Sequence, residues 1–161
     1  MSFRVSSVPP EIARQVRETL KSPQYGHPAH VDVARGYGPC RSCLRTFVTG
    51  RDKRTLFTFN PFAAGVPAPG PVFIHADECT PFEGEGFPPA LRDLPLLFEP
   101  VNGSGAPIER VRPDPHAVEQ VIAALFSRTD VAAIVVRNAE AGCFIAKVER
   151  AGANTALPIL L

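Results

Sequence analysis

Several features that would place a chain in a special class are missing from this sequence. No stretch approaches the ~20 consecutive apolar residues of a membrane-spanning helix, and there is no block of like charges. The 17 Lys and Arg residues nearly balance the 16 Asp and Glu residues, giving a formal net charge of +1. This balance supplies no long-range attraction to nucleic acid or to an anionic membrane, so we expect neither as a partner.

Export signals and a disulfide framework are lacking as well. The first residues, MSFRVSSVPPEIARQ, contain no continuous apolar core of a signal peptide. Four cysteines in 161 residues are far fewer than a disulfide-stabilised scaffold contains. We therefore expect a cytoplasmic protein whose thiols are reduced.

Proline and glycine, in contrast, are plentiful. The chain has 18 prolines and 12 glycines, and its hydrophobic share of 45% and charged share of 20% are typical of globular proteins. We expect one globular domain over residues 1–161 with long, rigid connections. Two of these connections are proline-rich loops at residues 63–71 and 80–95.

The apolar periodicity predicts two main helices and a set of short strands. Ile12, Val16 and Leu20 recur four residues apart within a helix expected over Pro10 to Lys21, and a second helix is expected over Pro115 to Ser127. Strands are expected at 3–8, 30–33, 55–59, 72–76, 96–101, 108–111, 131–136 and 143–149.

The connections between these strands decide the expected fold class. Most are too short to contain a crossover helix, so neighbouring strands should run antiparallel. We predict an α+β fold with a mostly antiparallel sheet and both main helices packed on one face. The apolar run at 72–76 suits a central strand of that sheet.

Cys40 and Cys43 form a C-x-x-C pair behind a Gly-Pro step. On a β-strand, residues three apart point to opposite faces, so the two thiols could meet only if residues 39–43 form a turn. A redox dithiol requires the pair at the start of a helix, and the β-branched residues that follow make a poor helix. Arg41 and Arg45 would nevertheless favour a thiolate.

A metal site and inert burial are the other two interpretations of the pair. Zinc needs four ligands, and the best remaining candidates are His75 and Cys79, which could reach only if the strand ends at Ala76 and the chain turns back. If the pair acts together, we expect Cys40, Cys43, His75 and Cys79 to bind zinc. Buried, inert thiols remain the default, because free cysteine is commonly buried.

The arginines suggest a site of another kind. Arg41, Arg45 and Arg137, with His75 and Glu140, could gather at one edge of the sheet and bind or convert an anionic small molecule. The rival hypothesis is a non-catalytic interaction domain that uses the proline-rich loops, with a structural zinc as an option. No sequence motif of a known catalytic site is present, so the pattern assigns no reaction.

Three segments resemble a known family. They are GYGPCRSCLR at 36–45, PVFIHADEC at 71–79 and VRNAEAGCFIAKVER at 136–150. They are similar to the marked segments of an uncharacterised family of small bacterial proteins, known as a domain of unknown function. The resemblance covers residues 36–150 and implies a small cytosolic domain in which the three segments converge. It implies no catalytic residue, because the family has no established activity.

Overall fold

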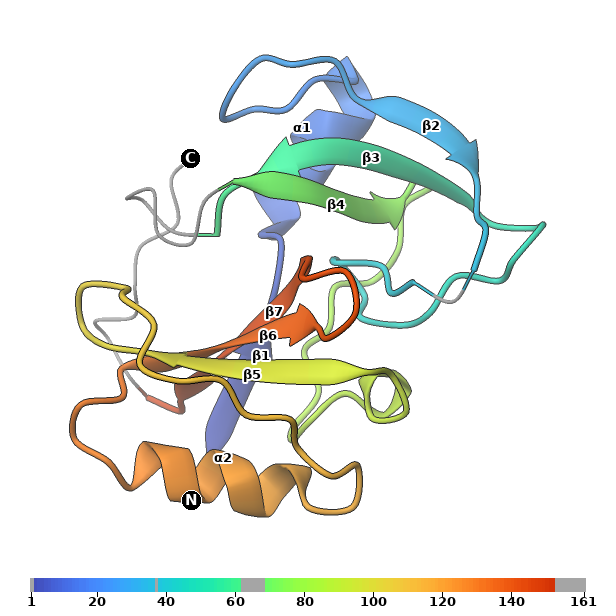
Figure 1. Ribbon diagram of the computed structural model, residues 1–161. Coiled ribbons are helices and arrows are strands. Elements are labelled where there is room, and N and C mark those ends of the chain that lie inside the picture. Colours follow the sequence, from blue (N-terminus) through green and yellow to red (C-terminus); the bar gives the residue numbers. More distant parts are fainter. Residues whose placement is uncertain (1, 37, 62–68, 153–161) are drawn as a thin grey trace.

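A computed structural model describes residues 2–36, 38–61 and 69–152 of the chain. Two α-helices, one short 3-10 helix and seven strands make up the regular structure of this part (Figure 1). In chain order they are β1 (Phe3–Ser6), α1 (Pro10–Thr19), β2 (His30–Val33), β3 (Lys53–Phe59), β4 (Gly70–His75), η1 (Pro89–Leu91), β5 (Leu96–Val101), α2 (Val118–Phe126), β6 (Ala133–Asn138) and β7 (Phe144–Arg150).

The strands form two separate sheets. One has four strands in the order β1-β7-β6-β5, the other has three in the order β2-β3-β4, and every pairing is antiparallel. The predicted α+β class with mostly antiparallel strands is confirmed. The expectation of one sheet with the 72–76 run at its centre is wrong, because β4 is the last strand of the smaller sheet.

Each helix belongs to a different hydrophobic core. α1 contributes Ile12 and Val16 to a cluster that contains residues of both sheets, whereas α2 contributes Ile122 to a cluster on the four-stranded sheet. Alternate residues of β6 explain the division: Val135 lies in the first cluster and Ile134 in the second. The four-stranded sheet thus lies between the two cores, with α2 along its lower side in Figure 1. The predicted placement of both helices on one face is not confirmed.

The ends of the helices follow local sequence chemistry. α1 starts at Pro10, whose missing N–H costs nothing in a first turn, and ends before Leu20, which adopts a left-handed conformation with φ 53°. α2 begins at Val118, three residues later than predicted. The predicted strand at 108–111 forms only isolated bridges to β5, at Pro107 and Val111. No helix in the described part of the chain is long and apolar enough to span a membrane.

Candidate metal centre

The C-x-x-C pair lies in a tight turn rather than on a strand. The Leu44 N–H donates to the Cys40 carbonyl at 2.9 Å, and the Cys40 N–H donates to the Arg45 carbonyl at 2.9 Å. Leu44 closes the turn with a φ of 58° and buries its side chain in the α2 core. This conformation brings both thiols to the same side, as shared chemistry of the pair requires.

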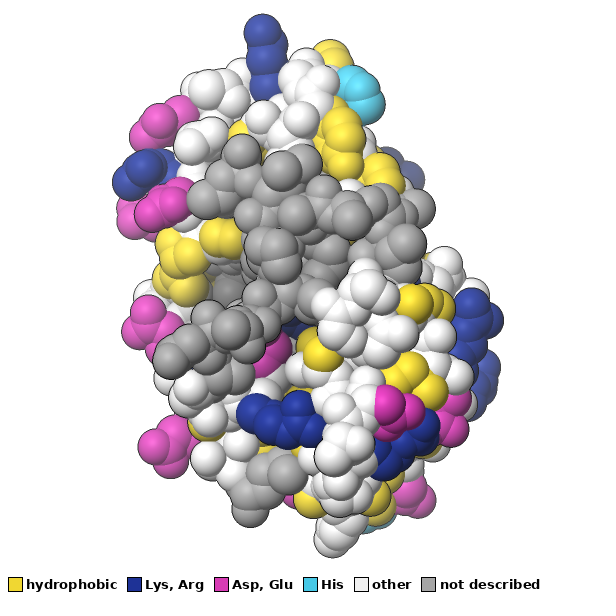
Figure 2. Space-filling model, turned by 90° about the vertical axis from the view of Figure 1, so that its left-hand side faces the viewer, with side chains coloured by type: hydrophobic (Ala, Val, Ile, Leu, Met, Phe, Trp, Pro, Cys, Tyr) yellow, Lys and Arg dark blue, Asp and Glu magenta, His cyan; other side chains and the backbone are white. Residues whose placement is uncertain are grey.

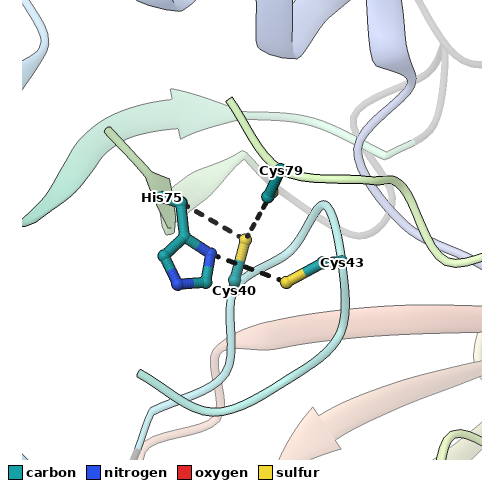
Figure 3. A group of neighbouring side chains, drawn as sticks. All are labelled: Cys40, Cys43, His75 and Cys79. Carbon is teal, nitrogen blue, oxygen red and sulfur yellow. Dashed lines mark hydrogen bonds between the residues drawn. The ribbon is translucent and has the colours of Figure 1, made fainter. Parts of the chain in front are cut away.

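His75 and Cys79 reach the pair because β4 ends at His75, one residue before the predicted end at Ala76, and the chain then turns back. His75 is the last residue of β4, and the chain bends at residues 76 and 77 before Cys79. A backbone hydrogen bond holds β4 against the turn, with the Arg41 N–H donating to the Phe73 carbonyl. A second one, from the Phe82 N–H to the Ser42 carbonyl, holds the segment that follows Cys79 against the same turn. The four side chains therefore point toward one another (Figure 3).

The spacing of the four ligand atoms suits a tetrahedral ion. All four lie within 4.8 Å of one another. The Cys40 and Cys79 sulfurs are 3.8 Å apart, and the Cys43 sulfur is 3.5 Å from His75 Nδ1. In tetrahedral zinc, with Zn–S bonds of ~2.3 Å and Zn–N bonds of ~2.0–2.1 Å, these separations are ~3.8 Å and ~3.6 Å. The cluster could hold a metal, and its donor set is compatible with zinc.

The imidazole of His75 is oriented from its other side. Its Nε2 lies 3.2 Å from Asp52 Oδ2, and the same carboxylate oxygen accepts the Val48 N–H at 2.8 Å. Phe47 packs against the ring with a centroid distance of 4.7 Å. A carboxylate that accepts one ring N–H leaves the other nitrogen as the ligand, which is the usual arrangement of metal-bound histidine. Here that leaves Nδ1, the nitrogen that faces the cysteines.

Three N–H groups point at the cluster's sulfurs. The backbone N–H of His75 and that of Ser42 donate to the Cys40 sulfur at 3.2 Å and 3.4 Å. Arg17 of α1 donates from Nη2 to the Cys79 sulfur at 3.3 Å and from Nε to the His75 carbonyl at 3.0 Å. Donors of this kind stabilise thiolates and hold them in place.

The pKa values of the neighbouring Cys43 and Cys40 thiols shift in opposite directions. Hydrogen bonds from Cys40 and then Cys79 lower the pKa of Cys43, whereas the hydrogen bond with Cys43 is the main reason why the pKa of Cys40 is raised. In return, Cys43 raises the pKa of the exposed Arg45. These opposite shifts favour ionisation of Cys43 over Cys40, and a bound cation would stabilise the ionised thiols.

The other residues predicted for an anion site do not gather at one place. Arg45 is exposed beside Cys43, whereas Arg41 is buried and donates to the carbonyls of Phe144 and Pro39. Burial, which disfavours the charged form, lowers the pKa of Arg41 to about 10.

Arg137 and Glu140 lie in a further part of the molecule. They line a separate hollow of about 480 Å³ between β5 and the β6–β7 turn. There Arg137 pairs with Glu99 at 3.2 Å. The sheet-edge site predicted from the sequence is thus divided among three locations.

Sequence reasoning missed Arg17 and Asp52. In the sequence, Arg17 is one of several polar residues between the apolar positions of α1. Asp52 stands two residues after Gly50, in a polar stretch typical of a surface turn. Their contacts span 62 and 23 residues of sequence, so no local spacing could indicate them. The proline-rich loop predicted at 63–71 lies, apart from residues 69–71, outside the described residues.

Fold and cluster together define an α+β protein with a metal-competent group of three cysteines and one histidine. The chain belongs to the DUF1203 family of proteins of unknown function, whose model matches residues 37–150. This range agrees with the resemblance carried by the three segments. No curated protein and no solved structure is significantly similar to the chain.

Proposed function

We propose that Cys40, Cys43, His75 and Cys79 bind one zinc ion in a structural site. The single observation that carries this proposal is the mutual approach of the four ligand atoms to within 4.8 Å. Three sulfurs and one imidazole nitrogen form a donor set that zinc prefers and that magnesium and calcium do not.

The two competing interpretations of the cysteine pair fit less well. A redox dithiol gains its low pKa from a helix N-terminus, but residues 40–52 contain no helix. Inert burial accounts for Cys40 and Cys43 individually, since both lie in the core. It does not account for a histidine that turns Nδ1 toward a thiol while a carboxylate holds Nε2.

The proposed zinc is structural because the protein supplies all four ligands. A catalytic zinc usually keeps one position for water or substrate, and a four-ligand site leaves none. The ion would fasten the 40–43 turn to the end of β4 and to the segment that carries Cys79. Through Arg17, it would also fix α1 to the same point. A structural zinc supports the second of the two hypotheses from the sequence, a non-catalytic interaction domain. In that hypothesis the 80–95 loop, which the Phe82 N–H anchors to the turn, would be a surface for a partner.

Elemental analysis of protein purified without added metal tests the proposal. We expect about one zinc per chain in the parent protein. Cys43→Ser and Cys79→Ser should each lose most of it. Cys143→Ser is the matched control, because Cys143 is also a free, partly exposed cysteine but lies outside the cluster. Protein that contains no metal and whose four thiols react independently would contradict the zinc site and favour the interpretation of inert, buried cysteines.

A further inference from the structure

Arg41 carries a buried charge that no acidic side chain of the described residues pairs with. Its exposed fraction is 5%, and within the described part of the chain its guanidinium donates from Nε to the Phe144 carbonyl and from Nη1 to the Pro39 carbonyl. A guanidinium has five N–H donors, and the two on Nη2 donate to neither of these carbonyls. Buried charges are normally paired, because removing an ion from water is costly.

The Arg41 side chain lines a pocket of about 440 Å³ on the outer face of the β3–β4 pair. Leu56 of β3 and Phe73 of β4, which are cross-strand partners, form an apolar floor. The β6–β7 turn contributes Asn138 and Cys143 from the other side. Each of the three segments that carry the family resemblance therefore contributes to this pocket, as the sequence led us to expect.

The charge of the pocket has one sign. Arg35 and Arg54 line it together with Arg41, and no Asp or Glu is among its described lining residues. Arg54 forms an ion pair with Asp32 at 2.8 Å and lies over the Phe73 ring. Arg54 and, through its charge alone, Arg35 lower the pKa of Asp32, whereas Arg41 has no acidic partner among the described residues. The side-chain oxygen of Asn138 accepts the Glu140 and Ala141 N–H groups, so this side chain can offer its Nδ2 amide N–H groups as donors to a ligand.

We propose that this pocket binds a small organic anion, a carboxylate or phosphate group attached to a compact apolar body. Arg41 and Arg35 would bind the anionic group, with Asn138 as an additional donor. Leu56 and Phe73 would pack against the apolar body. The site retains the anionic partner and Arg41 of the sequence prediction but excludes Arg45, His75, Arg137 and Glu140. None of the four proposed zinc ligands lines this pocket.

Isothermal titration calorimetry of the full chain as purified tests the pocket, with phenyl phosphate and benzoate as probes. We expect saturable binding of at least one probe with Kd below about 1 mM. Inorganic phosphate, which lacks the apolar body, should bind more weakly, and benzyl alcohol, which lacks the charge, should not bind. Absence of saturable binding by both probes would overturn the proposal.

Two variants locate the binding. Arg35→Gln removes an exposed charge without touching the core and should weaken binding about tenfold, the effect of losing one charge-assisted hydrogen bond. Gly38→Leu should abolish it by filling the pocket, since a Cβ there would meet no atom within 4 Å and the chain can still fold. The control is Arg112→Gln, an exposed arginine outside the pocket. Equal weakening by Arg35→Gln and Arg112→Gln, or unchanged binding in Gly38→Leu, would contradict the assignment.

Discussion

At the scale of single residues, His75 shows how tertiary contacts decide the chemistry of a side chain. The sequence identifies it as a candidate ligand because it ends an apolar strand four residues before Cys79. The structure adds the direction of its ring, with Nδ1 toward Cys43 and Nε2 toward Asp52. Asp52 thus positions the imidazole, and it would act on the proposed zinc through that ring.

Replacing Asp52 should therefore weaken metal binding without removing a ligand. We expect Asp52→Asn to lower zinc affinity by about 10- to 100-fold, the usual effect of losing such a carboxylate. Asparagine can still accept the Val48 N–H, so the turn should persist. Competition with a chromophoric chelator measures the affinity, with Asp130→Asn, an exposed acid outside the cluster, as control. Matching affinities in the two variants would exclude the role of Asp52.

The same variant should change the pH at which zinc is released. The Val48 N–H, followed by His75, holds the pKa of Asp52 below its ordinary value of 3.8. A carboxyl with a depressed pKa contributes above that ordinary value and loses its contribution as pH falls through the folded-state pKa. Asp52 thus stays ionised while protons begin to displace zinc from the thiolates. Asp52→Asn should release zinc at a higher pH, which a fluorescent zinc indicator would detect. A release curve that coincides with that of the parent protein would contradict this.

At the scale of secondary-structure elements, α1 connects the core to the cluster. Its apolar side packs through Ile12 and Val16, while Arg17 reaches from the same helix to Cys79 and the end of β4. The helix is thus anchored both by hydrophobic burial and by hydrogen bonds to the proposed centre. The periodicity of the sequence predicts the first of these anchors and gives no sign of the second.

Arg17→Gln should remove the hydrogen bonds from α1 to Cys79 and His75 while leaving the apolar packing of the helix in place. We expect the helix and its core to remain, while Cys79 is alkylated several-fold more slowly by iodoacetamide in zinc-free protein, because its thiolate loses a cationic donor. Arg14→Gln is a matched control, because Arg14 lies one turn earlier on α1 and lines the same surface pocket without a contact to the cluster. Mass spectrometry of the modified Cys79 peptide gives the rate. Equal rates in both variants would show that Arg17 does not stabilise the Cys79 thiolate.

At the scale of the whole molecule, two cores share the four-stranded sheet, and the cluster lies in only one of them. Cys40 and Cys43 belong to the core that contains α1, whereas α2 covers the other face. Acidic and basic side chains are dispersed over the face shown in Figure 2, in keeping with the nearly balanced net charge. The α2 core should therefore support the fold without affecting the cluster directly.

A core substitution tests this separation. Ile122 is fully buried, and Ile122→Ala should cost about 2–5 kcal/mol of unfolding free energy through lost burial and a cavity. Zinc content per folded chain should not change. Gln120→Ala, at an exposed position of the same helix, should stay within about 0.5 kcal/mol of the parent. Urea denaturation gives the free energies, and loss of zinc from folded Ile122→Ala would show that the cores are coupled.

Much of the fold and part of the site could be predicted from the sequence, because those features depend on residues that are close together in the chain. The helices and the β6–β7 hairpin depend on neighbouring residues, so periodicity and turn chemistry indicate them. The turn at residues 39–43 could be stated only as the condition for the two thiols to meet. The division into two sheets depends on pairings such as His30 with Leu56, which local patterns do not encode. Similarly, the four ligands follow from two short spacings plus two turns, whereas Arg17 and Asp52 come from distant segments.

X-ray absorption at the zinc K-edge tests the central claim most directly. The sample is the full chain, purified without added metal. We predict a first shell that fits three sulfurs at ~2.3 Å and one nitrogen at ~2.0–2.1 Å. The Cys143→Ser variant should give the same spectrum, and Cys79→Ser should lose a sulfur or the edge itself. Absence of a zinc edge in the parent protein, or a shell of oxygen and nitrogen without sulfur, would contradict the proposed centre.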